Sequence, residues 1–73
     1  SWIIENIHLF PDADIQVFDR WGRLVFRSDG GYDNDWKGTG PNGKDLPVDT
    51  YYYVIDLKAK GIKPITGTIG IIR

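Results

Sequence analysis

Apolar residues in this chain come in short runs separated by turn-forming residues, and no run sustains a helical period. The runs are rich in β-branched and aromatic residues, a pattern typical of strands. A chain of 73 residues has room for one small domain, which on folding removes only about 60% of its surface from water. Three Trp, four Tyr and three Phe can fill such a core. We therefore predict an all-β domain of five or six antiparallel strands, a small immunoglobulin-like β-sandwich or partial Greek key.

Two runs in the first half predict an antiparallel hairpin. Residues 15–18 and residues 24–26 would pair, and Gly22 would supply the positive φ that a tight or bulged turn requires. A further strand is expected over residues 2–9, with a bulge or bend, ending where Phe10, Pro11 and Asp12 break the pattern.

The second half predicts two more strands. Residues 50–59 form the strongest one, and its core-facing side chains are Tyr51, Tyr53, Ile55 and Leu57. Residues 65–73 form the last strand, because Ile65, Ile69 and Ile71 align on one face and Pro64 is tolerated only at its start or on an edge.

Residues 28–47 are dense in turn formers and predict one long loop. An ordered loop of this length needs side chains of its own to hold it, so we expect Tyr32 and Trp36 to fold back on the core. Asn42 and Gly43 indicate a separate tight turn within the loop.

Composition excludes several classes of function. A net charge of -1 with both signs interspersed provides no basic face for nucleic acid. The absence of cysteine excludes a disulfide framework, a thiolate metal site and a cysteine nucleophile. No apolar run approaches a membrane span, and the amino end lacks a signal peptide. Because Ser1 is not a natural initiator, we expect the chain to be a piece of a longer polypeptide.

Three minor hypotheses concern chemistry. His8 is the one candidate base, but its alternating run favours a solvent-facing strand residue over a catalytic role. Asp29, Asp33 and Asp35 share a glycine-rich loop that could hold calcium, although their spacing is not that of an EF-hand and such residues commonly make turns.

Exposed aromatic rings raise the third hypothesis, sugar binding by stacking. The candidates are Trp2, Trp21 and Trp36, and a core of this size needs the same rings, so burial is the favoured interpretation. Arg20, Arg23 and Arg27 lie around the predicted hairpin and form either a recognition patch or partners for nearby carboxylates and tryptophan.

Four ordered motifs resemble the gliding motility-associated C-terminal domain, the type B sorting domain of the type IX secretion system. The first is residues 15–26, Ile-Gln-Val-Phe-Asp-Arg-Trp-Gly-Arg-Leu-Val-Phe. The others are Tyr32 with Asn34, Trp36 and Gly38; Leu46-Pro47 with residues 50–55; and the closing residues 67–73. Asp49 stands where that family often has glycine, and Lys37 where an acidic residue is frequent. The Asn-Gly-Asp-Gly segment that usually precedes the position of Trp2 is missing.

This resemblance implies that residues 1–73 are a non-enzymatic C-terminal signal domain of a large secreted protein or adhesin. The domain would direct its parent through the periplasm and the outer membrane to the cell surface by binding an outer-membrane β-barrel of the translocon. We expect no cofactor, no metal, no nucleic acid, no direct membrane insertion and a monomeric state. The alternative is a passive immunoglobulin-like spacer or a carbohydrate-binding module of a surface adhesin.

Two segments are candidates for partner binding. One is the hairpin turn, Arg20, Trp21, Gly22 and Arg23, where Trp21 could instead plug one end of the core. The other is the final strand, where the partner could add a strand to the edge or grip apolar and terminal groups. Its candidate residues are Gly67, Gly70, Ile71, Ile72 and Arg73.

Overall fold

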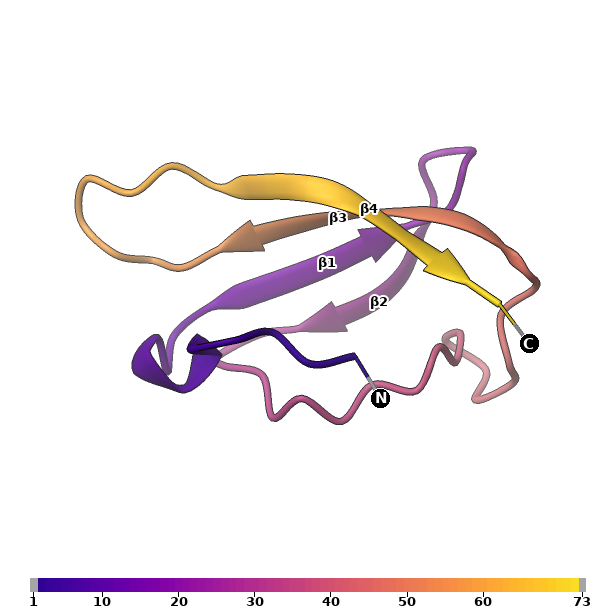
Figure 1. The fold of residues 1–73 in the computed structure, drawn as a ribbon, viewed down its shortest axis with the longest axis horizontal. Coiled ribbons are helices and arrows are strands. Elements are labelled where there is room, and N and C mark those ends of the chain that lie inside the picture. Colours follow the sequence, from indigo (N-terminus) through magenta and orange to yellow (C-terminus); the bar gives the residue numbers. More distant parts are fainter. Residues whose placement is uncertain (1, 73) are drawn as a thin grey trace.

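The computed structural model describes residues 2–72 and forms, within them, one short 3-10 helix and four strands. The elements are η1 (Ile7–Leu9), β1 (Asp14–Phe18), β2 (Leu24–Ser28), β3 (Asp49–Asp56) and β4 (Ile65–Ile71). The strands form a single sheet in the order β2-β1-β3-β4, and all neighbours are antiparallel (Figure 1). The all-β class is therefore confirmed.

The second layer of the domain is irregular chain. Because β2 and β3 are both antiparallel to β1, they run in the same direction, and the chain between them must travel back along the sheet. Residues 29–48 make this connection and pass over one face together with the amino-terminal segment (Figure 1). Four strands in residues 2–72 stand against the five or six expected, and the sandwich and Greek-key arrangements are not confirmed.

The predicted hairpin is confirmed, with a bulge. Val17 pairs with Phe26 and Phe18 pairs with Leu24, so Val25 is the extra residue. The bulge lets Val25 and Phe26 both pack against the core. Gly22 has φ 80° in the turn, the conformation for which glycine was expected.

The strand predicted over residues 2–9 is wrong. Asn6 adopts a left-handed conformation with φ 64°, which reverses the extended chain before Ile7–Leu9 closes a 3-10 turn. The preceding segment bonds to the long loop instead of joining the sheet. Trp2 N–H donates to the Trp36 carbonyl at 2.8 Å, and Ile4 N–H donates to Asn34 Oδ1 at 2.7 Å.

The two carboxy-terminal strands are confirmed, with different ends. β3 stops at Asp56, whose Oδ1 accepts the N–H of Lys58 at 3.0 Å, and Lys58 turns the chain with φ 57°. The predicted extension to residue 59 is therefore wrong. β4 ends at Ile71, and residue 73 lies outside the described residues.

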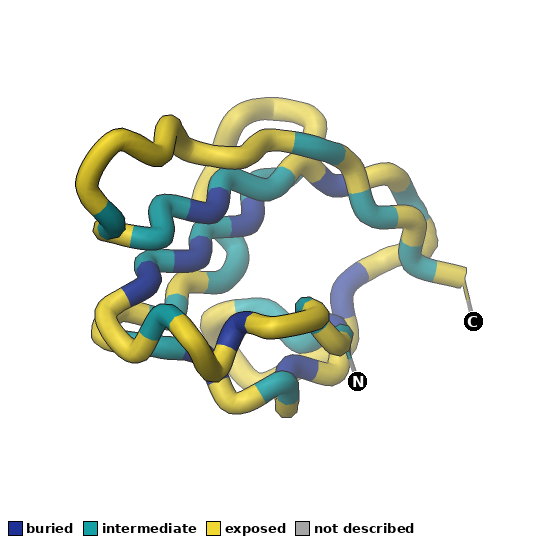
Figure 2. The backbone as a smooth tube through the Cα atoms, turned by 60° about the vertical axis from the view of Figure 1, so that its left-hand side comes forward, coloured by how far each residue is buried: buried dark blue, intermediate teal, exposed yellow. Residues whose placement is uncertain are grey.

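The core lies between the sheet and the irregular layer. Ile15 and Val17 of β1 are fully buried. Loop residues cover them, as predicted, since Tyr32 and Trp36 are 7% and 5% exposed. Figure 2 shows buried positions both on the strands and on the irregular chain opposite them. The rest of the buried set comes from all parts of the chain: Ile7, Ala13, Leu46, Tyr51 and Ile55.

Five aromatic rings hold the two layers together. They are Trp2, Phe26, Tyr32, Trp36 and Tyr53, and their contacting centroids lie 4.9–6.1 Å apart. The Tyr32 hydroxyl donates to the Trp2 carbonyl at 2.5 Å and accepts the Trp36 N–H at 3.2 Å. Burial raises the pKa of Tyr32, so its hydroxyl stays protonated and remains a donor at neutral pH.

These contacts predict that Trp36→Ala lowers the free energy of unfolding by about 3–5 kcal/mol, because it empties a buried site between the layers. Urea denaturation measures the loss. The matched control is Trp21→Ala, expected to cost less than about 1 kcal/mol, because Trp21 is 74% exposed and not the core plug considered above. Equal losses in the two variants would contradict this account.

Candidate partner-recognition surface

Asp19 organises the turn between β1 and β2. Its Oδ1 accepts the N–H groups of Trp21 and Arg23, each at 2.9 Å, and its Oδ2 accepts Arg23 Nε at 2.9 Å. Desolvation opposes ionisation of this carboxyl, but the hydrogen bonds from Arg23 and Trp21 outweigh it and lower the pKa of Asp19. The turn is therefore held in one conformation by a single ionised side chain.

Arg20 ties the same turn to the start of β3. Its Nε lies 3.2 Å from Asp49 Oδ2, and its guanidinium carbon lies 5.9 Å from the centre of the Trp21 ring. Arg20 thus contacts both a carboxylate and a tryptophan, which is the second of the two roles considered for the arginines. Trp21 itself projects from the turn and is 74% exposed.

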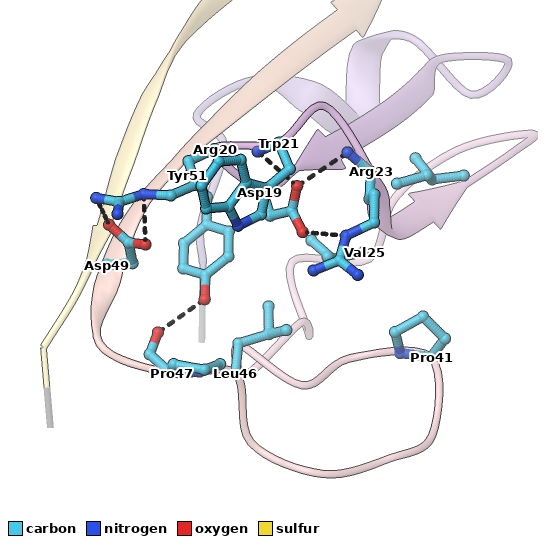
Figure 3. A pocket seen from close by; sticks show the side chains of 11 residues that line it. Asp19, Arg20, Trp21, Arg23, Val25, Pro41, Leu46, Pro47, Asp49 and Tyr51 are labelled. Carbon is cyan, nitrogen blue, oxygen red and sulfur yellow. Dashed lines mark hydrogen bonds and ion pairs between the residues drawn. The ribbon is translucent and has the colours of Figure 1, made fainter.

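A shallow hollow of about 340 Å³ lies beside this turn. Arg20, Trp21 and Arg23 stand on one side of it, and the loop prolines Pro41 and Pro47 stand on the other (Figure 3). Its apolar wall is made by Val25, Leu46 and Tyr51, and the Tyr51 hydroxyl donates to the Pro47 carbonyl at 2.8 Å. The turn and the loop together therefore form a concave, partly apolar surface with cationic groups at its rim.

The sheet brings both predicted partner-binding segments to the same end. Phe18 and Leu24 pair where β1 ends and β2 begins, and Asp49 pairs with Ile71 where β3 begins and β4 ends. The bond between Arg20 and Asp49 joins the two segments through β3. Ile72 follows directly and is 89% exposed. Arg73, the last predicted site residue, lies outside the described residues.

The two glycines of β4 have different surroundings. A Cβ atom on Gly67 would overlap the ring of Tyr53, whereas a Cβ on Gly70 would meet nothing within 4 Å. Glycine at position 67 therefore makes room for the ring of Tyr53. Gly70 lies in the open, at the same end of the sheet as Ile71.

The calcium hypothesis finds no support in the geometry of the loop. Within residues 2–72, no three His, Asp or Glu side chains gather closely enough to hold a metal ion. Asp29 lies 3.6 Å from Arg27 Nη2, and Arg27 also bonds to Asp14 at 3.1 Å. Arg27 thus pairs with carboxylates, the second role considered for the arginines.

The remaining sequence candidates are not gathered into a site. His8 is exposed, as expected, but on the 3-10 helix and not on a strand. Of the three tryptophans, Trp36 is buried, Trp2 is half-buried against it, and Trp21 alone offers its ring to solvent. No platform of several exposed tryptophans exists for stacking sugars in the described chain.

Sequence reasoning missed three residues that shape this surface. Asp19 could have been found from its place before a glycine turn, because aspartate there commonly accepts backbone N–H groups. Asp49 was noted only as a departure from glycine, and it is the partner of Arg20. Tyr51 was assigned to the core, yet its ring also lines the hollow.

The geometry describes a small β-domain that offers a concave surface beside an exposed turn. Comparison with protein families agrees with that class. The chain matches the CHU_C type IX secretion signal domain over residues 1–71 and belongs to this family, which is not an enzyme family. Comparisons with curated proteins and with solved structures return no match.

Membership implies that the protein is secreted or displayed at the cell surface. In the part of the chain that the structure describes, no helix is long and apolar enough to cross a membrane.

The crowding at Gly67 predicts that Gly67→Ala lowers the free energy of unfolding by about 1–3 kcal/mol, because Tyr53 must move away from the sheet. Gly70→Ala serves as the matched control and is expected to change stability by less than about 0.5 kcal/mol. Thermal and urea denaturation of both variants test the difference. A neutral Gly67→Ala would show that Tyr53 does not occupy this position.

The lowered pKa of Asp19 predicts an acid-sensitive turn. Because the folded pKa lies below the ordinary 3.8, the ionised carboxylate contributes stability above that value, and this is lost as the pH falls through the folded pKa. Urea denaturation between about pH 2 and pH 6 should show a flatter pH dependence for Asp19→Asn than for the wild type. Asp33→Asn removes one exposed carboxylate as the control. Unchanged pH dependence in Asp19→Asn would refute the assignment.

Proposed function

We propose that this domain is a non-enzymatic sorting signal, recognised in its folded form by an outer-membrane protein of the type IX translocon. The observation that carries the proposal is the meeting of the β1–β2 turn and the end of β4 at one end of the sheet, within a domain of the type IX secretion signal family. In this proposal, residues 1–73 form one sorting domain that delivers a larger parent protein or adhesin to the cell surface.

The turn suits recognition because it is rigid and exposed at once. Asp19 fixes the backbone of Trp21 and Arg23 by two hydrogen bonds and holds the Arg23 side chain by a third, so little conformational freedom remains to be lost on binding. Trp21 offers a large apolar ring, and tryptophan and arginine are among the residues enriched where binding energy concentrates. The side chain of Arg23 is 76% exposed and can reach a partner's carboxylate.

The alternative of a sugar-binding module is less well supported. Trp2 and Trp36 are committed to the ring cluster, which leaves a single exposed tryptophan for stacking. A passive spacer would not need the exposed Trp21 that the turn presents.

Fusing the chain to the end of a soluble periplasmic reporter tests the proposal in a host with type IX secretion. We expect the reporter to reach the cell surface, and to stay in the periplasm when the translocon is disrupted. Retention of the reporter in intact cells, together with glycan binding by the purified fusion, would support the alternative.

The double variant Arg20→Gln with Arg23→Gln tests the surface itself. We expect it to lose most surface delivery while its thermal midpoint falls little, because exposed ion pairs contribute only about 0–1 kcal/mol. The matched control is Lys44→Gln with Lys60→Gln, which removes two exposed positive charges elsewhere and should be exported normally. Undiminished delivery of the arginine variant would assign both arginines to the scaffold.

A further inference from the structure

The outer edge of β4 lacks the features that normally protect an edge strand. The seven residues Ile65–Ile71 contain no charged side chain and no proline, and their register with β3 is unbroken over seven pairs. Natural edge strands are usually short, bulged or charged, because unpaired backbone groups otherwise invite another strand. Pro64 precedes the strand and lies outside it.

The opposite edge of the same sheet is protected. β2 has five residues, its register with β1 shifts at a bulge, and it carries Arg27. Arg27 is ion-paired with Asp14 at 3.1 Å and with Asp29 at 3.6 Å, which places charge across that edge. The contrast within one sheet indicates that the open edge at β4 is specific to that strand.

A second observation comes from the core side of the open edge. A hollow of about 550 Å³ lies between β4 and the irregular layer. It is lined mainly by apolar side chains, among them Trp2, Trp36, Ile69, Ile71 and Ile72. Ile69 pairs with the buried Tyr51 and therefore faces the core side of the sheet. A strand added beside β4 would direct every second side chain into this hollow.

The charges around the outer edge of β4 indicate what charge a partner segment would carry. Lys37 lines the hollow where β4 ends, and Lys63 lies two residues before β4 begins, and both are exposed. Neither β4 nor the lining of the hollow contributes a carboxylate. Lysines flanking both ends of an uncharged strand favour a segment that carries negative charge at its own ends.

We propose that β4 is a strand-addition site for an extended segment of a partner protein, with small apolar side chains at alternate positions and carboxylates at its ends. Backbone bonds to β4 would supply affinity, and the hollow under Ile69 and Ile71 would select the apolar side chains. This deepens the proposed function, on which it rests, by specifying the chemistry of what the translocon component presents.

A synthetic peptide tests the proposal directly. The probe is a blocked seven-residue peptide of alternating valine and threonine with an aspartate at each end, titrated into the 73-residue chain and followed by amide and indole NMR shifts. We expect the shifts to concentrate on residues 65–71 and on the Trp2 indole. Shifts confined to β2, or no saturable binding, would overturn the proposal.

Backbone methylation of the peptide tests strand pairing. The N–H groups of a strand alternate between its two edges, so methylating the valine amides blocks one edge and methylating the threonine amides blocks the other. We expect one methylated peptide to bind and the other to fail. Equal binding by both would show that the peptide does not add to the sheet as a strand.

Charge reversal at the rim provides the matched variants. Lys37→Glu should weaken binding of the aspartate-flanked peptide about twofold to fivefold and strengthen binding of a lysine-flanked version, because the pair is exposed. Lys44→Glu places the same charge change in the Asn42–Gly43 turn and should alter neither. Identical effects of the two variants would overturn the assignment of Lys37.

Failure of this inference is distinguishable from failure of the proposed function. If the reporter fusion is exported but the peptide does not bind, the sorting role stands and the strand-addition site falls. Dimerisation of the free chain through β4, unaffected by the peptide and detected by sedimentation, would assign the edge to a second copy and would also overturn the inference.

Discussion

The packing of Trp36 and Tyr32 against the sheet is the interaction on which the rest of this domain depends. Because β2 and β3 run in the same direction on either side of β1, their connection must cross a face of the sheet. Residues 29–48 contain an isolated bridge between Thr39 and Asp45 but no strand, so aromatic rings and the Tyr32 hydroxyl hold the connection against the sheet. Tyr32 and Trp36 thus anchor the irregular layer within the cluster of five rings that joins it to the sheet.

Much of this arrangement could be predicted from the sequence. The hairpin followed from residues 15–26, where alternation and Gly22 act over short distances, and the burial of Tyr32 and Trp36 followed from the need to hold a long loop. The prediction of a strand over residues 2–9 was wrong, because apolar alternation does not reveal that Asn6 adopts a left-handed conformation. The hydrogen-bond partners of this segment lie about thirty residues away in the long loop, and such long-range pairings leave no local sequence pattern.

For the candidate site, the sequence predicts a set of residues but not the surface that they form. Motif likeness selected Arg20 to Arg23 and the end of the last strand, and the antiparallel pairing placed both at one end of the sheet. What sequence reasoning could not supply was the direction of side chains. Trp21 projects into solvent while Gly67 lies under Tyr53, and both outcomes depend on contacts between elements distant in sequence.

The bond between Arg20 and Asp49 also means that this surface exists only in the folded domain. Its two halves come from positions 29 residues apart, and they meet only after β1 and β3 have paired. An unfolded or misfolded polypeptide has the same sequence, but its Arg20 and Asp49 are not in contact. A receptor that requires both Arg20 and Asp49 in contact would therefore bind the folded domain and not the unfolded chain.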